Sequence, residues 1–240
     1  MTTINSLFYI LKIILKYNNL KLNKYLMDKN FGQASQDLFV LSVTDNKNNG
    51  YFLEIGSNHP IDHNNTYLLE NKYNWKGLMV EYDNSFEELY KVHRPNSIYV
   101  IDDARVVKYR DILDNNNFPT NMDYLQIDLD VNNKSTLDTL LLLDETVFDK
   151  YKFSTVTFEH DIYTGNYFNT RELSRQIFEK RGYVLAFPDI KVFWNNEYQP
   201  FEDWYIHPDL ISIDFINKIK SDVSLNHYEI ITKIMEIKQL

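Results

Sequence analysis

The segment of residues 50–83 constrains the fold of this chain more than any other. Residues 51–55 form a short apolar run, residues 66–73 have apolar side chains at helical spacing, and residues 78–80 form a second apolar run. A strand, a helix and a strand in this order predict a βαβ unit of a parallel sheet.

Polar or glycine residues follow both predicted strands of this unit. Ligands of open α/β sheets bind beyond the carboxyl ends of the strands. A glycine there lets the backbone approach a ligand closely because it has no Cβ, and an acid there can accept both hydroxyl hydrogens of a ribose. We therefore expect a ligand crevice formed by Glu54, Gly56, Ser57, Asn58 and Glu81.

Strand and helix patterns alternate along the rest of the chain. Further strands are expected at residues 98–101, 124–127, 155–158 and 183–187, with helices at 84–93, 134–143 and 170–181 and two more over 214–240. This alternation predicts an α/β fold with a Rossmann-like, mostly parallel sheet and helices on both faces. We expect a helical extension at residues 1–30, the α/β domain at 31–213, and C-terminal helices at 214–240 that pack on the same domain.

Composition limits the partners and the compartment. The chain has 240 residues, a net charge of -9 and no cysteine. An acidic chain is a poor binder of the phosphate backbone, so nucleic acid is not expected as a partner. The absence of cysteine removes disulfides and thiolate metal sites and fits the cytosol. The apolar run at residues 7–15 contains Lys12 and is too short to cross a membrane. We expect it to form an amphipathic helix that packs on the domain or on a second subunit of a homodimer, with docking at a membrane surface as the alternative.

An ordered set of motifs resembles the FkbM-like family of S-adenosylmethionine-dependent methyltransferases. The set spans residues 31–210 and begins with FGQASQDLFV at residues 31–40. The later motifs are Glu54-Ile55-Gly56, Asn65-Thr66, Trp75-Lys76-Gly77, Glu81, Leu125-Gln126-Ile127-Asp128, Phe158-Glu159-His160 and Phe201-Glu202-Asp203-Trp204-Tyr205. The chain departs from the family pattern at Ser57-Asn58-His59-Pro60, where a second glycine is usual, and at Leu129-Asp130, where Glu-Gly is usual.

The resemblance implies a class I methyltransferase fold and an S-adenosylmethionine site at the tips of the first three strands. Gly56 and Ser57 would lie beside the methionine part of the cofactor, and Glu81 would hold the ribose. The remaining residues implied for the cofactor are Gln36, Glu54, Asn58, Thr66, Tyr82, Asp102, Asp103 and Ala104. A solvated acid at the strand end is the alternative for Glu81, a helix cap is the alternative for Gln36, and a helix cap or an exposed turn is the alternative for Asp102 and Asp103.

Acidic residues after the fourth and fifth predicted strands indicate the site of the chemistry. Asp128 and Asp130 alternate along one extended segment, and Glu159 and Asp161 are expected beside them. Crowded carboxylates repel one another unless a cation or a proton relieves them, so these four residues are the predicted ligands of a Mg²⁺ ion. His160 is the predicted general base, and Asp128 the second catalytic residue. Alternatives are a hydrogen-bonded structural role for His160 and an N-cap for Asp130.

The sequence therefore predicts an O-methyltransferase that acts on a sugar hydroxyl of a glycan or glycan precursor. A metal-dependent nucleotide-sugar glycosyltransferase is the rival, because Asp128-Leu129-Asp130 can hold a metal against a diphosphate. A non-catalytic binding module on the same fold is a third hypothesis, motivated by the two departures from the family pattern. The composition, rich in Asn, Ile, Lys and Tyr, is typical of an AT-rich genome and suggests the cytoplasm, including that of a virus-infected host cell.

Overall fold

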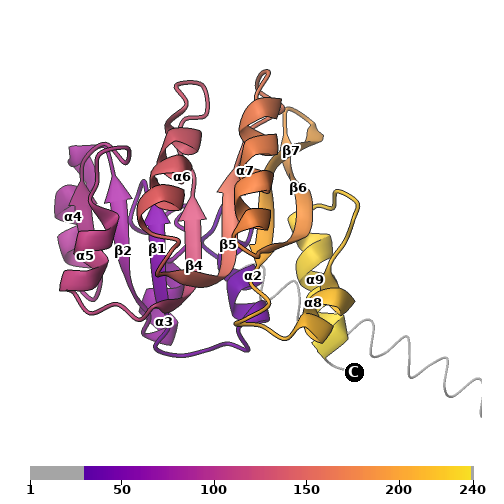
Figure 1. The fold of residues 1–240 in the computed structure, drawn as a ribbon, viewed down its shortest axis with the longest axis horizontal. Coiled ribbons are helices and arrows are strands. Elements are labelled where there is room, and N and C mark those ends of the chain that lie inside the picture. The colour runs from indigo at the N-terminus through magenta and orange to yellow at the C-terminus, as the bar shows by residue number, and fades with distance from the viewer. Residues whose placement is uncertain (1–29, 239–240) are drawn as a thin grey trace, which may run out of the picture. The chain divides into compact units, whose positions relative to one another are not determined.

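The computed structural model describes residues 30–238, which form a seven-stranded sheet and its covering helices (Figure 1). The predicted amphipathic helix at residues 7–15 lies outside the described residues. The strands are β1 Tyr51–Ile55, β2 Lys76–Glu81, β3 Ile98–Ile101, β4 Asn121–Ile127, β5 Lys152–Glu159, β6 Val184–Trp194 and β7 Glu197–Ile206. The helices are α2 Gln36–Val43, α3 Tyr67–Tyr73, η1 Asn84–Phe86, α4 Glu87–His93, α5 Tyr109–Asn115, α6 Ser135–Thr146, α7 Phe168–Lys180, α8 Ile213–Ile219 and α9 His227–Lys238. Within this part of the chain no helix is long and apolar enough to cross a membrane.

The strand order is β3-β2-β1-β4-β5-β7-β6. Strands β1 to β5 pair in parallel, whereas β7 runs antiparallel to both β5 and β6. Helices cover both faces, and Figure 1 shows α6 and α7 in front of the sheet with α2 and α3 behind it. The predicted fold class is confirmed. The order also reverses between β1 and β4, which is the topological switch point where open α/β sheets bind ligands.

Two helices, α2 and α5, were not predicted from the sequence. All eight residues of α2 are buried, so no polar face reveals its helical period. Helix α5 has only seven residues. The antiparallel hairpin β6–β7 was also missed, because the strand pattern gives the period of a strand but not its direction.

The two faces of the sheet differ in chemistry near the carboxyl ends of the strands. On one face Phe158 of β5 and Tyr205 of β7 pack on Phe178 of α7. On the other face Trp204 of β7 stacks on Phe39 of α2, with ring centroids 4.4 Å apart. Side chains alternate along a strand, so residues paired in register share a face. Glu54 pairs with Gln126, and Glu159 pairs with Glu202, which places these polar groups on the face that α2 covers.

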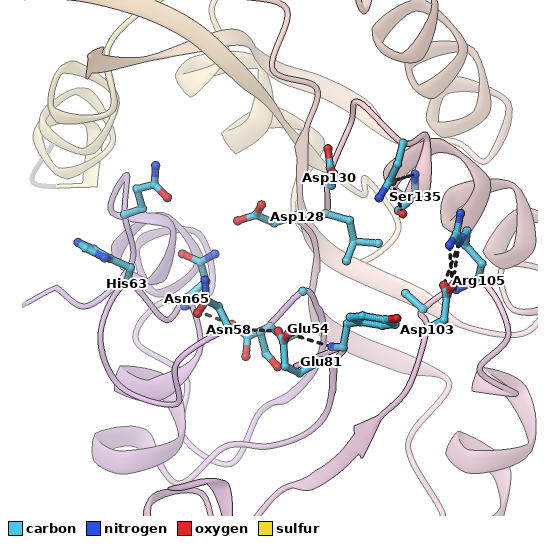
Figure 2. A pocket seen from close by; sticks show the side chains of 17 residues that line it. Glu54, Asn58, His63, Asn65, Glu81, Asp103, Arg105, Asp128, Asp130 and Ser135 are labelled. Carbon is cyan, nitrogen blue, oxygen red and sulfur yellow. Dashed lines mark hydrogen bonds and ion pairs between the residues drawn. The ribbon is translucent and has the colours of Figure 1, made fainter. Parts of the chain in front are cut away.

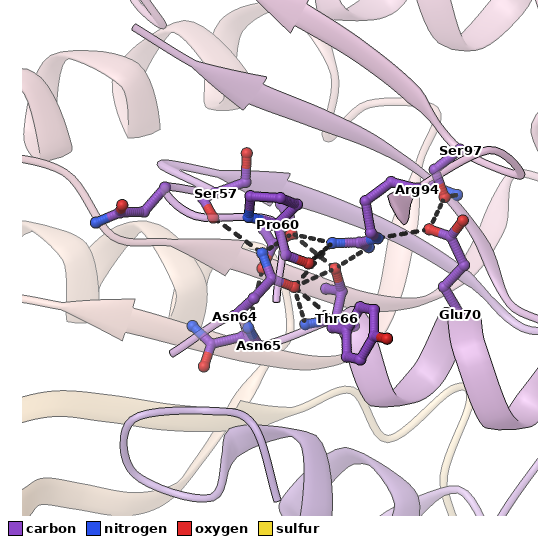
Figure 3. A network of polar contacts seen from close by, with 12 residues as sticks. Ser57, Pro60, Asn64, Asn65, Thr66, Glu70, Arg94 and Ser97 are labelled. Atoms are coloured by element: carbon purple, nitrogen blue, oxygen red, sulfur yellow. Dashed lines mark hydrogen bonds and ion pairs between the residues drawn. The ribbon is translucent and has the colours of Figure 1, made fainter. Parts of the chain in front are cut away.

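A buried guanidinium fixes the segment that links β1 to α3 (Figure 3). Arg94, at the end of α4, is 1% exposed and donates to Glu70 Oε2 at 2.8 Å, to Asn64 Oδ1 at 2.8 Å and to Thr66 Oγ1 at 2.6 Å. Its Nη1 also lies 3.9 Å from Glu54 Oε2. One side chain thus connects α3, α4, β1 and the loop that follows β1.

The C-terminal helices contact the same sheet domain. Helix α9 lies against α2, α8 and β6. Lys191 of β6 forms an isolated bridge with Asn226, immediately before α9.

We predict that Arg94→Ala destabilises the protein by about 3–5 kcal/mol, because removal of one partner leaves buried carboxylates without compensation. Urea unfolding followed by circular dichroism measures the loss. Lys91→Ala is the matched control, since Lys91 of the same helix makes only exposed ion pairs with Glu87 and Glu88. Equal unfolding midpoints for the two variants would contradict the role assigned to Arg94.

Candidate functional site

A cavity of about 730 Å³ lies at the carboxyl ends of β1, β2, β3 and β4 (Figure 2). It is within the usual size range of small-molecule sites. Predicted site residues that line it are Glu54, Gly56, Ser57, Asn58, Glu81, Tyr82, Asp103, Ala104, Asp128 and Asp130. The structure therefore brings residues from four strand ends to one crevice, as the βαβ pattern and its strand-end residues predict.

Gly56 is required by the turn that opens this cavity. Its φ is 82°, a conformation that side chains rarely adopt, and its N–H donates to Val80 O at 2.9 Å. A Cβ at this position would lie 1.7 Å from the backbone oxygen of Asp128. Only glycine permits β1 and β4 to approach so closely at the floor of the cavity.

The loop after Gly56 lacks the second glycine that is usual in the family, and hydrogen bonds to side chains fix its conformation. Asn58 has a φ of 48°, the left-handed conformation that a glycine would supply. Its N–H donates to Glu81 Oε2 at 2.6 Å. Ser57 Oγ lies 2.8 Å from the hydroxyl of Tyr90. The departure at Ser57-Asn58-His59-Pro60 therefore leaves an ordered turn and an open cavity.

Glu81 organises the rim at the end of β2. Its Oε1 accepts the N–H groups of Tyr82 and Asp83, both at 2.8 Å. Together with Asn58 these donors use three of the roughly four acceptor positions of a carboxylate. One acceptor position therefore remains for a ligand, and the adjacent Tyr82 ring is 77% exposed beside it.

Glu54 lies deeper and is fully surrounded. Its carboxylate accepts Thr66 Oγ1 at 2.6 Å and the Asn65 N–H at 3.2 Å. Burial raises the pKa of Glu54 to about 7, although Arg94 and these hydrogen bonds lower it. Glu54 thus forms the base of the cavity, and Thr66 supports it without lining the cavity.

Three predicted cofactor residues do not line the cavity: Gln36, Thr66 and Asp102. Gln36 donates to Glu202 Oε1 at 3.1 Å and accepts the Ala34 N–H at 2.8 Å. Asp102 is exposed, and its carboxylate accepts the Asp103 N–H at 2.7 Å. Asp102 therefore matches the exposed-turn alternative, whereas Gln36 bonds to the distant Glu202 and to the Ala34 N–H before the helix and does not cap α2.

The side chain of His160 lies on the opposite face from the cavity, so the structure does not place it as the expected base. It follows Glu159 on β5 and points the other way because successive side chains alternate. Its Nε2 lies 3.5 Å from Asp189 Oδ1 and 3.6 Å from Asp203 Oδ1, and neither ring nitrogen makes a hydrogen bond. The neighbouring carboxylates outweigh burial and raise the pKa of His160.

The predicted Mg²⁺ ligands do not converge on one point. Figure 2 shows the carboxylates of Asp128 and Asp130 directed differently. Burial and the neighbouring carboxyl groups of Asp128 and Asp161 raise the pKa of Glu159 well above its usual value. In residues 30–238 the single group of three side chains close enough to hold a metal is instead His160, Asp189 and Asp203. Arg175 already occupies both of its carboxylates, at 3.0 and 2.7 Å, so this group is an internal ion-pair network.

Sequence reasoning missed several residues of the site. Arg105 lines the cavity, and its guanidinium lies 2.6 Å from Asp103 Oδ2. Gly32 bridges to His63, so residues from before α2 reach the rim. No sequence pattern signals either contact, since both depend on how the loops fold. The missed lining residues are Gln33, His63, Asn65, Arg105, Leu129, Asn133 and Ser135.

Solved structures with a similar fold include methyltransferases. A methyltransferase from Pyrococcus furiosus is 15% identical, with 80% of this chain and 98% of that chain covered and a TM-score of 0.47. An O-methyltransferase from Bacillus cereus in complex with SAH is 12% identical, with 79% and 89% covered and a TM-score of 0.45. A TehB-like SAM-dependent methyltransferase from Corynebacterium glutamicum is 11% identical, with 80% and 96% covered and a TM-score of 0.45. Sequence identities and TM-scores this low do not indicate the activity of this chain. The activity must therefore be inferred from the residues of the site.

No family model and no curated protein matches the chain. The resemblance to the FkbM-like family therefore stays a prediction.

Buried acids make stability depend on pH in a defined direction. The raised pKa of Glu54 means that the folded protein binds a proton at a pH where the unfolded chain does not. Stability is then greatest below the unfolded pKa of 4.5 and falls as pH rises towards 7. Burial also raises the pKa of Asp37 to about 6, in the same direction. Burial lowers the pKa of His227 to about 4, which opposes the effect below pH 6.5.

We predict that wild type gains about 1 kcal/mol more stability than Glu54→Gln when the pH falls from roughly 8 to 6.5. His227 contributes equally to both proteins, so the difference isolates Glu54. Denaturant unfolding at the two pH values measures it, with Glu145→Gln on the exposed side of α6 as the control that keeps the wild-type dependence. Identical pH dependence in Glu54→Gln and wild type would show that Glu54 is ionised throughout.

Proposed function

We propose that the cavity binds S-adenosylmethionine and that the protein transfers its methyl group to a sugar hydroxyl. The proposal rests on one observation. Gly56 and Glu81 both line a single cavity at the topological switch point of the sheet. A dinucleotide or nucleoside ligand bound at such a point lies across the strand ends. The mostly parallel sheet with its antiparallel β7 supports the class I methyltransferase reading.

The residues present fit the parts of this cofactor. The Gly56 turn leaves the space that a Cβ would fill, which suits the methionine part. The remaining acceptor position of Glu81 suits a ribose hydroxyl, and the exposed ring of Tyr82 can stack on an adenine. Asp103 and Ala104 extend the same wall after β3. When bound, the cofactor supplies an electrophilic methyl group on a sulfonium sulfur.

The contribution of the chain to transfer is to hold the acceptor hydroxyl and take its proton. Asp128 follows β4 beside Gly56, and its carboxyl faces the cavity. Burial raises the pKa of Asp128, which brings the carboxyl closer to the basicity that proton transfer requires. This assignment uses Asp128 as the catalytic base in place of His160 and does not require Mg²⁺.

We predict that Glu81→Ala and Tyr82→Ala each weaken binding of S-adenosylhomocysteine by roughly tenfold to a hundredfold, through loss of a charged hydrogen bond or of a stacking surface. Titration calorimetry measures the affinities. Tyr198→Ala, which removes an exposed ring from the distant hairpin, is the control and keeps wild-type affinity.

The same titrations test the rival functions. Binding of uridine diphosphate with Mg²⁺ and not of S-adenosylhomocysteine would establish the glycosyltransferase alternative. If neither ligand binds, the result would favour a non-catalytic module. The five acids on the cavity wall, Glu54, Glu81, Asp103, Asp128 and Asp130, oppose a diphosphate in the absence of a metal.

A further inference from the structure

One side of the proposed cofactor cavity carries amide and imidazole side chains, whereas acids line its base and other sides. The residues of this side are Gln33, His63 and Asn65, and we call them the amide–imidazole wall. Figure 2 shows His63 and Asn65 on the side of the cavity opposite Asp103 and Arg105. The wall therefore lies away from the end of the cavity that Tyr82 and Asp103 form.

Contacts of the segment before α2 hold this wall together. Gly32 pairs with His63 in an isolated parallel bridge, which joins this segment to the loop after β1. The buried carboxylate of Asp37 accepts the Gly32 N–H at 3.4 Å. A Cβ on Gly32 would lie 2.8 Å from Asn65 Oδ1, so a glycine lets the Asn65 amide lie against the segment. The fold thus fixes the residues of the wall as neighbours.

The side-chain amide of Asn65 is buried although its oxygen has no partner. Asn65 is 3% exposed, and its backbone N–H donates to Glu54 Oε1 at 3.2 Å. Its Oδ1 accepts no hydrogen bond from the described part of the chain. The adjacent Asn64 differs, because its Oδ1 accepts Arg94 Nη1 at 2.8 Å and its Nδ2 donates to Ser57 O at 2.9 Å. Buried amides normally use their polar atoms, so the amide of Asn65 is available to a ligand in the cavity that it lines.

The charges around the cavity select the ligand group that fits this wall. Acids such as Asp128 and Asp130 attract an ammonium group and repel a carboxylate. The amide groups of Gln33 and Asn65 can donate to a carboxylate, and an amide oxygen can accept from an ammonium. An α-amino acid carries both charged groups on one carbon, whereas an adenine or a sugar hydroxyl carries neither. The wall therefore matches a zwitterion.

We propose that Gln33, His63 and Asn65 bind the α-amino-acid group of S-adenosylmethionine, and that Asn65 makes the affinity for the cofactor depend on this group. This inference rests on the proposed function, which places the same molecule in the cavity. With its adenine at Tyr82 and its ribose at Glu81, the cofactor extends across the cavity to the wall. The amide of Asn65 donates to the carboxylate and accepts from the ammonium, and the other two side chains supply further donors to the carboxylate.

The test is titration calorimetry with S-adenosylhomocysteine and with 5′-methylthioadenosine, which keeps the adenine, the ribose and the sulfur but lacks the amino-acid group. We expect wild type to bind S-adenosylhomocysteine about tenfold or more tightly than methylthioadenosine. Asn65→Ala should weaken S-adenosylhomocysteine by about tenfold and change the affinity for methylthioadenosine by less than about twofold. Asn115→Ala, at the exposed end of α5, is the control and keeps both affinities.

Two further variants test the wall without a buried substitution. Gln33 and His63 are exposed, so Gln33→Ala and His63→Ala keep the core unchanged. Each should weaken S-adenosylhomocysteine and leave methylthioadenosine unaffected. Urea unfolding of Asn65→Ala should give a midpoint close to that of wild type, because Asn65 Oδ1 has no hydrogen bond to lose within residues 30–238.

The contrary results separate the subsite from the proposed function. Equal affinities of wild type for the two ligands overturn the subsite, and so does an unchanged affinity for S-adenosylhomocysteine in all three variants of the wall. An equal loss of both ligands in Asn65→Ala also overturns it, because Asn65 would then only shape the cavity. Failure of wild type to bind either ligand overturns the proposed function itself.

Discussion

The buried guanidinium of Arg94 is the interaction on which the candidate site depends. It holds Asn64 and Thr66 by hydrogen bonds, and Thr66 in turn donates to Glu54 at the base of the cavity. A charge at 1% exposure is tolerated only when its donors are used, and here Glu70, Asn64 and Thr66 use them. Arg94, the residue that follows α4, therefore fixes the loop after β1.

This support explains how the turn keeps its conformation without a second glycine. A glycine-rich turn achieves its conformation through backbone freedom, whereas the turn here uses Asn58 in the left-handed region and hydrogen bonds from Ser57 and Asn58 to Tyr90 and Glu81. Gly56 alone remains indispensable, because the backbone of Asp128 lies where its Cβ would be. The conformation of the turn therefore depends on side-chain hydrogen bonds, and Glu81 accepts one of them from the Asn58 N–H.

Alternation along β5 separates two kinds of polar chemistry that are adjacent in sequence. Glu159 lies on the face of the sheet that α2 covers, while His160 faces Asp189 and Asp203 on the α7 side. The two carboxylates beside His160 pair with arginines of α7: Asp189 with Arg171 and Arg175, and Asp203 with Arg175. These ion pairs join the β6–β7 hairpin to α7.

The sequence by itself determined the alternation of strands and helices, the βαβ unit at residues 50–83 and the strand-end residues Gly56, Glu81 and Asp128, because apolar periodicity and strand-end position are local properties. Only the tertiary structure decided that β7 lies antiparallel between β5 and β6. It also decided that the side chain of His160 lies on the face opposite the cavity, and that Gln36 donates a hydrogen bond to Glu202. Those outcomes depend on strand direction, on the register of β5 with β7 and on the packing of α2. Residues far apart in the chain create these contacts, so no local pattern can encode them.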